Sequence, residues 1–349
     1  MIETRSLNRL CLGVISTLCL GTISPLHAED GMTQRSQNAL PFVTVRDRTG
    51  DDDPEEYFGD ERGPERSGWC DVQQTKVPAL ASLAEAAPFR IPGEFLKVTA
   101  VREVDRAEIF DALEAADTPR APVLYTHGYN VGFEKGCRRA TTLQENANLK
   151  DKFLWFSWPA DGVPTNYMRD ETDLYWSAPS LADLIADMSD RFAPQSISVA
   201  GHSLGGRGLA LALYIMAAQH PGVTLDNAVL LAPDMDFETF VRILPSIRDQ
   251  AARITIYTAV DDRALEVSER LHGYPRLGQS GNPVEILTGV EIIDISELRV
   301  DSASGHLYHI YGPRVGQDLD QLLNKGLGAA DRDGLVRIGQ NHWSLLPDD

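Results

Sequence analysis

The chain has 349 residues, of which 51 are acidic and 32 are basic, so its formal net charge at pH 7 is −19. A surface of this charge repels nucleic acid and anionic bilayers, which attract clustered Lys and Arg side chains, and the composition therefore argues against a nucleic-acid binder. Hydrophobic residues make up 43% of the chain and charged residues 24%, which is typical of folded domains and not of disordered chains.

The first 28 residues predict a secretory signal peptide that is cleaved after Ala28. Arg5 and Arg9 precede an apolar run over residues 10–23, and two acidic residues follow Ala28. The alternative is an uncleaved membrane anchor, but the run is shorter than the roughly 20 residues that span a bilayer. We therefore expect an exported protein, periplasmic or extracellular, with no stable membrane insertion after cleavage.

Residues 29–75 predict an acidic, poorly ordered leader between the signal peptide and the folded domain. Residues 45–67 are rich in Asp, Glu, Arg, Gly and Pro and lack apolar periodicity. A docking arm is the alternative interpretation of this segment. The folded domain is predicted over 76–328, and it is followed by a polar tail over 329–349 that either packs back on the domain or stays loose.

Cys70 and Cys137 are the only cysteines outside the predicted signal peptide. Because thiols tend to pair in an oxidising compartment, we expect a disulfide between them, with two free thiols as the alternative. No Cys/His spacing indicates zinc, and His306 and His309, three residues apart, have no accompanying carboxylate or thiol at the usual spacing. The sequence therefore predicts no metal site.

Apolar runs of strand length alternate with segments of helical periodicity through the predicted domain. Such runs suit strands that are buried on both faces of a parallel sheet, and parallel neighbours need helical crossovers. The sequence thus predicts an α/β fold with a mostly parallel, doubly wound sheet flanked by helices. The predicted strands are 95–101, 122–126, 153–158, 196–200, 228–232, 254–259 and 290–295, and the predicted helices are 131–149, 180–192, 204–219, 237–247 and 263–271.

The predicted strand 196–200 is followed at once by Gly-His-Ser-Leu-Gly at 201–205 and then by a long apolar helix. This is the G-x-S-x-G nucleophile elbow in its required context, with a strand before it and a helix after it. The two glycines leave room for a sharp turn that projects the Ser203 hydroxyl out of the sheet. Ser203 is therefore the predicted nucleophile.

The predicted strand 122–126 ends in His127-Gly128-Tyr129, which predicts an oxyanion loop. In this position the backbone N–H of Tyr129 supplies one oxyanion donor, and the N–H of Leu204 supplies the other. The alternative is a plain strand-to-helix turn in which His127 is a structural residue.

The predicted base and acid lie downstream of the serine, in the chain order of this fold. His306 is the first histidine beyond the last predicted strand and is the expected general base, with His309 as the alternative. Asp262 follows the strand 254–259 and is the favoured acid, while Asp234 and Asp261 remain open as alternatives; each of these aspartates could instead cap a helix.

The chain resembles the α/β-hydrolases and, more narrowly, the bacterial alpha/beta hydrolase family formerly named DUF900. The resemblance covers about residues 95–325, and it implies the α/β-hydrolase fold and the triad Ser203, Asp262 and His306. It rests on the motifs HGYN at 127–130, FSWP at 156–159, GHSLGGR at 201–207, LAPDMD at 231–236, DRAL at 262–265 and GH at 305–306.

We expect a serine hydrolase that cleaves carboxylic esters of small molecules through an acyl-enzyme intermediate, with no cofactor. An amidase or peptidase with the same triad is one alternative, and a catalytically silent envelope binding protein on a hydrolase scaffold is another. The segment 161–180, with three large aromatic side chains, either covers the pocket as a lid or packs against the domain. The sequence does not specify the acyl group, the alcohol or the oligomeric state.

Overall fold

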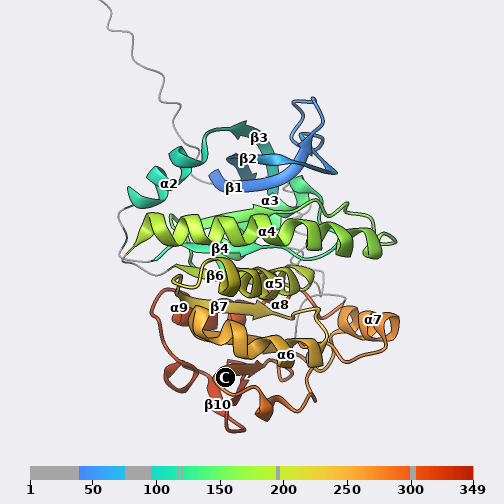
Figure 1. Cartoon of the computed structure of the whole chain (residues 1–349), viewed down its shortest axis with the longest axis vertical. Helices are drawn as coiled ribbons and strands as arrows, with labels where there is room; N and C mark the ends of the chain where they lie inside the picture. The colour runs from blue at the N-terminus through green and yellow to red at the C-terminus, as the bar shows by residue number, and fades with distance from the viewer. Residues whose placement is uncertain are drawn as a thin grey trace, which may run out of the picture. The chain divides into compact units, whose positions relative to one another are not determined.

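A computed structural model describes residues 39–74, 96–116, 118, 121–193, 197–298 and 304–348 of the chain. The predicted signal peptide lies outside the described residues. The described part is built on an eleven-stranded sheet of order β10-β11-β9-β8-β7-β6-β4-β5-β1-β2-β3 (Figure 1). Its strands are β1 (Ala39–Arg48), β2 (Phe58–Gln74), β3 (Leu96–Glu103), β4 (Val123–Thr126), β5 (Phe153–Ser157), β6 (Ser198–His202), β7 (Leu225–Leu231), β8 (Ala251–Thr258), β9 (Val290–Asp294), β10 (Leu335–Arg337) and β11 (His342–Leu345).

In the central part of this order, β11-β9-β8-β7-β6-β4-β5-β1, each strand is parallel to the next one. Antiparallel pairing joins β1 to β2, β2 to β3 and β10 to β11, at the two outer ends. The strands β4 to β9 coincide, within a few residues at their ends, with six of the predicted apolar runs. The predicted mostly parallel α/β fold is therefore confirmed.

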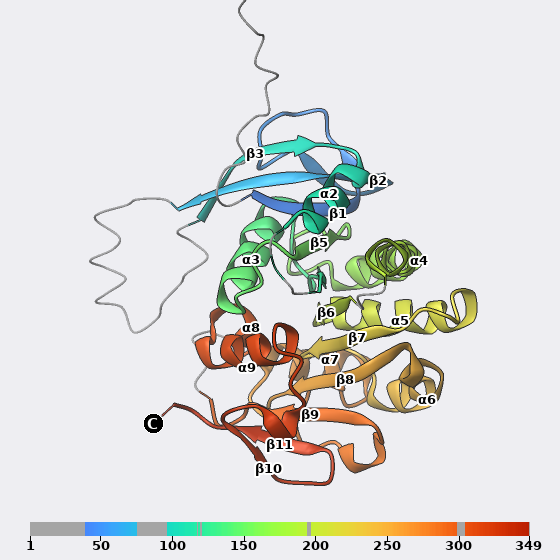
Figure 2. The same cartoon turned by 90° about the vertical axis from the view of Figure 1, so that its left-hand side faces the viewer.

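Helices cover both faces of the sheet, as the short parallel connections require. Figure 2 shows α3, α8 and α9 on one face and α4 and α6 on the other. The α-helices of the described residues are α2 (Arg106–Glu114), α3 (Phe133–Asn146), α4 (Tyr167–Phe192), α5 (Leu204–Gln219), α6 (Phe237–Ile247), α7 (Arg263–His272), α8 (Tyr308–Tyr311) and α9 (Pro313–Leu323), and the 3₁₀ turns are η2 (Arg248–Gln250), η3 (Val284–Ile286) and η4 (Ala329–Asp331).

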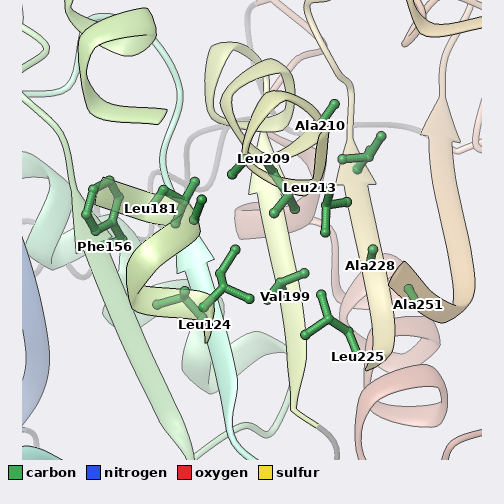
Figure 3. Close-up of a cluster of buried hydrophobic side chains, with 14 of the residues drawn as sticks. Leu124, Phe156, Leu181, Val199, Leu209, Ala210, Leu213, Leu225, Ala228 and Ala251 are labelled. Carbon is green, nitrogen blue, oxygen red and sulfur yellow. The ribbon is translucent and has the colours of Figure 1, made fainter. Parts of the chain in front are cut away.

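Each face of the sheet buries its own apolar core. In the core on the α4–α5–α6 face, Leu181 of α4 and Leu209 of α5 belong to one cluster with Leu124 of β4 and Val199 of β6 (Figure 3). Burying a leucine side chain of this kind stabilises the fold by about 1.5–3 kcal/mol. The two cores hold β6 and its neighbours as a rigid frame, and the loops at the carboxyl ends of these strands carry the candidate site.

The prediction of a poorly ordered leader over 29–75 is wrong for the residues that the structure describes, because 39–74 form β1 and β2. Phe42 and Val43 of β1 are fully buried, and β1 pairs in parallel with β5. The acidic run at 51–56 is the turn between β1 and β2, so its polar composition reflects a solvent-exposed turn. The folded unit therefore begins well before residue 76.

The boundary predicted at residue 328 is also wrong, since the tail continues the fold. Residues Leu335–Arg337 and His342–Leu345 form β10 and β11, and β11 extends the sheet by pairing with β9. Leu345 is completely buried. The tail thus packs back on the domain, which was one of its two expected states.

Two further segments differ from the sequence prediction. The helix predicted over 180–192 begins earlier, because α4 starts at Tyr167 and continues through Pro179. The strand at Leu96–Glu103 is an antiparallel outer strand in which only Val98 is buried, and not a buried parallel strand. Among the described helices, none is both long enough and apolar enough to cross a bilayer.

Candidate active site

Ser203 occupies the sharp turn between β6 and α5. Its backbone has φ 55° and ψ −123°, a conformation that costs a non-glycine residue about 1–3 kcal/mol. Two hydrogen bonds hold it there: the Ser203 N–H donates to the Leu231 carbonyl at 2.9 Å, and the Ser203 carbonyl accepts from the Asp234 N–H at 3.1 Å. The serine is thereby fixed at the carboxyl end of β6, where ligands bind in open parallel sheets.

The glycines around Ser203 are required by close backbone approaches. A Cβ at Gly201 would lie 2.6 Å from the Gly205 carbonyl oxygen, and one at Gly205 would lie 2.3 Å from the His127 carbonyl oxygen. A Cβ at Gly128 would lie 2.9 Å from Ser203 Cβ. The HGY loop after β4 therefore packs directly against the serine turn, as the two motifs predicted.

His306 and Asp262 form a buried pair. His306 Nδ1 lies 2.6 Å from Asp262 Oδ2, and the Asp262 side chain is completely buried. The other carboxylate oxygen, Oδ1, accepts the backbone N–H groups of Ala264 and Leu265, each at 3.1 Å, and so caps α7. The sequence offered helix capping and histidine binding as alternative roles for this aspartate, and the structure gives it both.

Asp234, the first alternative acid, has other partners. Its Oδ1 accepts from Arg276 Nε at 2.8 Å and from Ser268 Oγ at 2.6 Å, and its Oδ2 accepts from the Tyr167 hydroxyl at 2.6 Å. Burial alone would raise the pKa of Asp234, but the guanidiniums of Arg207 and Arg276 outweigh burial and hold the pKa below its ordinary range. This carboxylate is an ionised counter-ion for two arginines.

Asp261, the second alternative acid, is exposed. His309, the alternative base, is completely buried, and its Nε2 lies 3.2 Å from the Tyr125 hydroxyl. The structure brings only His306 into contact with one of the three candidate aspartates, and that aspartate is Asp262.

Three imidazoles cluster next to the serine turn, and those of His202 and His309 are stacked. The ring of His202 is 4.5 Å from that of His306 and 4.0 Å from that of His309, between ring centroids. His202 Nε2 donates to the His306 carbonyl oxygen at 3.0 Å, which fixes both the tautomer of His202 and the position of the His306 backbone. Burial, reinforced by the neighbouring histidines, holds the pKa of His202 and of His309 well below the usual value.

Ser203 and His306 line the same cleft, whose volume is about 430 Å³. The loop after β4 contributes Tyr129, the start of α4 contributes Tyr167, and α7 contributes Leu271. Among the described residues, no acceptor is hydrogen-bonded to the backbone N–H of Tyr129 or of Leu204. These are the two amides that the sequence predicted as oxyanion donors.

His127, at the start of the same loop, has a structural environment. Its ring stacks on Trp158 with 5.1 Å between centroids, and its Nδ1 lies 2.8 Å from the Gly128 carbonyl oxygen. Burial, aided by the charge of Arg46, lowers the pKa of His127 to about 3. His127 is therefore a neutral ring that shapes the loop, in line with the structural alternative for this residue.

The structure joins Cys70 of β2 to Cys137 of α3 in a disulfide, the pairing that the sequence predicted. The bond ties the outer antiparallel strands to the helix that follows the HGY loop. Among the residues that the structure describes, no group of three or more His, Cys, Asp or Glu side chains is arranged to hold a metal ion.

Sequence reasoning missed the role of Arg207, which lies one turn into α5. Its Nε donates to the Asp234 carbonyl oxygen, and its other nitrogens donate to Glu171 and to the Tyr167 hydroxyl. It is the one charged side chain in the otherwise apolar helix Leu204–Gln219. A single arginine in such a helix could have indicated a buried ion pair. Arg207 connects α4, α5 and the loop after β7 beneath the cleft.

The mostly parallel sheet, the strained serine turn after β6 and the histidine–aspartate pair after the later strands together define an α/β hydrolase. The family model described as "Alpha/beta hydrolase of unknown function (DUF900)" matches residues 104–325, well over half of the chain. The chain therefore belongs to this family, and the family predicted from the sequence motifs is confirmed.

An uncharacterized protein of Nostoc sp. is 27% identical over 122 residues, a match that covers 28% of this chain and 32% of that protein. The chain thus spans about a third of the length of this curated relative. Solved structures similar to this chain include a CIB-like hydrolase from Thermoplasma acidophilum (15% identity, 64% of this chain, 91% of that chain, TM-score 0.37) and an esterase from Pyrobaculum calidifontis (17% identity, 59% of this chain, 78% of that chain, TM-score 0.34).

Proposed function

We propose that this α/β hydrolase is a serine hydrolase that cleaves carboxylic esters through an acyl-enzyme intermediate. One observation carries the proposal: His306 binds Asp262 through Nδ1 and lines the same cleft as Ser203. In this arrangement Ser203 is the nucleophile, His306 the general base and Asp262 the acid that orients it.

The contacts of Asp262 support its role. Two backbone N–H groups hold its Oδ1, so that its Oδ2 stays directed at His306 Nδ1. This bond leaves the second imidazole nitrogen, Nε2, unprotonated and able to take the hydroxyl proton of Ser203. The aspartate then stabilises the imidazolium that forms.

The reaction proceeds in two halves. Ser203 Oγ attacks the ester carbonyl while His306 takes its proton, and the backbone N–H groups of Tyr129 and Leu204 bind the negative oxygen of the tetrahedral intermediate. His306 then returns the proton to the leaving alcohol. Water, deprotonated by the same histidine, hydrolyses the acyl-enzyme and regenerates Ser203.

We further propose that the protein works outside the cytoplasm on small-molecule esters. A signal peptide predicted over residues 1–28 supports this location, and the disulfide between Cys70 and Cys137 is compatible with it, because disulfides persist in oxidising compartments. The volume of the cleft, about 430 Å³, suits a small acyl or alcohol group.

Hydrolysis of p-nitrophenyl esters of graded acyl length, compared with the matching p-nitroanilides, tests the proposal. We expect ester turnover that Ser203→Ala abolishes and anilide turnover that is at least about tenfold slower. Faster hydrolysis of the anilides would favour an amidase or peptidase with the same site. Absence of turnover on both series would favour a silent binding protein on a hydrolase scaffold.

A further inference from the structure

Two charged side chains other than histidine line the cleft within the described part of the chain, and only one of them has its charge compensated. Asp234 is the compensated residue, since Arg207 and Arg276 both bind it. The other is Arg139, from the second turn of α3. The charge of Arg139 therefore remains available at the wall of the cleft.

Arg139 is partly buried, and its hydrogen-bond partner is the hydroxyl of Tyr311. No carboxylate among the described residues forms an ion pair with it. Burial is the main cause that lowers the pKa of this guanidinium, although arginine remains charged at neutral pH. A desolvated cation without a counter-ion is unfavourable, and a bound anion would relieve that cost.

We propose that Arg139 binds an anionic group of the substrate, so that the enzyme acts on esters whose acyl or alcohol part carries a carboxylate. The inference rests on the proposed esterase function and names the substrate class of the same cleft. A guanidinium suits a carboxylate because its N–H groups match the two oxygens in geometry.

The cleft combines this charge with apolar side chains. Val267 and Leu271 of α7 line it together with Arg139. An ester with an apolar chain and a charged end would match both kinds of side chain.

The overall charge of the protein explains why this contact has to be local. With a net charge of −19, the surface does not attract anions at long range. Selection of an anionic substrate therefore depends on direct contact with Arg139 inside the cleft.

A structural role for Arg139 is the competing explanation, because its charge also helps to lower the pKa of His202 and of His309. The two roles differ in what they predict. A structural arginine affects all esters equally, whereas a recognition arginine affects only the charged ones. The test therefore compares matched neutral and anionic substrates.

The kinetic test uses mono-p-nitrophenyl glutarate, adipate and suberate, together with their neutral methyl diesters, after subtraction of spontaneous hydrolysis. We expect wild-type enzyme to prefer at least one anionic ester over its neutral partner in kcat/KM. Arg139→Gln should reduce that preference by about ten- to hundredfold, mainly through KM, as expected for loss of a charge-assisted hydrogen bond. Arg139→Lys should retain part of it.

Arg138→Gln is the matched control, because it removes the same charge one residue away. Arg138 does not line the cleft and binds Glu134 through Nε and Nη2 at 2.7 and 2.9 Å. This variant should keep the preference of wild type within about twofold. An equal preference in wild type and Arg139→Gln would overturn the inference.

A binding experiment separates this inference from the proposed function. Adipate binding to Ser203→Ala is measured by calorimetry and compared with binding to the Ser203→Ala/Arg139→Gln double variant. We expect the double variant to bind about tenfold or more weakly, whether or not any ester is turned over. Equal affinity of the two proteins for adipate would contradict the anionic subsite even if Ser203 proves to be an active nucleophile.

Discussion

Asp262 binds His306 with one carboxylate oxygen and the start of α7 with the other. The distance from His306 Nδ1 to Oδ2 is 2.6 Å, and Oδ1 accepts two backbone N–H groups at 3.1 Å. The two backbone N–H groups hold the Asp262 carboxylate in place, and the carboxylate in turn holds the imidazole of His306 in one orientation. The same residue thus links the stability of α7 to the geometry of the proposed catalytic pair.

Asp262→Asn should reduce kcat by about a hundredfold or more, because an amide nitrogen facing Nδ1 favours the wrong histidine tautomer. Ser203→Ala and His306→Ala should each nearly abolish turnover, since nucleophile and base act as a unit. Turnover of p-nitrophenyl esters is measured on variants whose circular dichroism matches wild type. A folded Asp234→Asn variant that loses more activity than Asp262→Asn would reassign the acid.

Asp234→Asn should mainly lower the free energy of unfolding and have a smaller effect on turnover. The substitution leaves the buried guanidiniums of Arg207 and Arg276 without their shared carboxylate, and removing one partner of a buried ion pair costs about 3–5 kcal/mol. Urea unfolding measures the loss. Asp261→Asn, at an exposed position, is the control and should stay within about 0.5 kcal/mol of wild type. Equal stability of the two variants would show that the arginines do not depend on Asp234.

The serine turn and the contact of His306 with Asp262 could be predicted from the sequence because their signals are local. Strand, glycine turn and apolar helix are contiguous around Ser203, and His306 is the first histidine after the last predicted strand. The β1–β2 hairpin could not be predicted, because β1 pairs with β5, more than a hundred residues away, and its polar turn resembles a linker. The contact of His202 with His309 likewise arises only from the fold.

Stability should fall as the pH drops below about 6.5. The pKa of His127 is lowered to about 3, and the pKa values of His202 and His309 lie well below 6.5, so these three histidines are neutral when folded but protonate when unfolded. The unfolded state then binds more protons, so each histidine lowers the free energy of unfolding by about 1.4 kcal/mol between pH 7.5 and 5.5.

Asp170 acts in the opposite direction. Burial raises its pKa to about 6, so its protonation offsets part of the loss as the pH falls from about 6 toward 3.8. Urea unfolding at pH 7.5 and 5.5 tests the histidine contribution. His309→Gln should reduce the loss of unfolding free energy between these pH values by about 1.4 kcal/mol. A wild-type stability that rises between pH 7.5 and 5.5 would contradict this assignment.

The disulfide should stabilise the fold by about 4 kcal/mol in the chain-entropy model, because its two cysteines are 67 residues apart. A Cys70→Ser/Cys137→Ser variant is compared with wild type by urea unfolding, and free thiols are titrated in unfolded, unreduced wild-type protein. We expect no free thiol from Cys70 or Cys137. Two titratable thiols from these residues would show that the bond does not form in the isolated protein.

Covalent labelling of Ser203 by a fluorophosphonate, located by peptide mass spectrometry, tests most directly whether Ser203 is an activated nucleophile. Only a serine that is activated by a neighbouring base reacts rapidly with this reagent. We expect fast labelling of Ser203 in wild type, at least about a hundredfold slower labelling in His306→Ala, and intermediate labelling in Asp262→Asn. Unlabelled Ser203 in folded wild-type protein, or labelling that is independent of His306, would contradict the proposed serine hydrolase site.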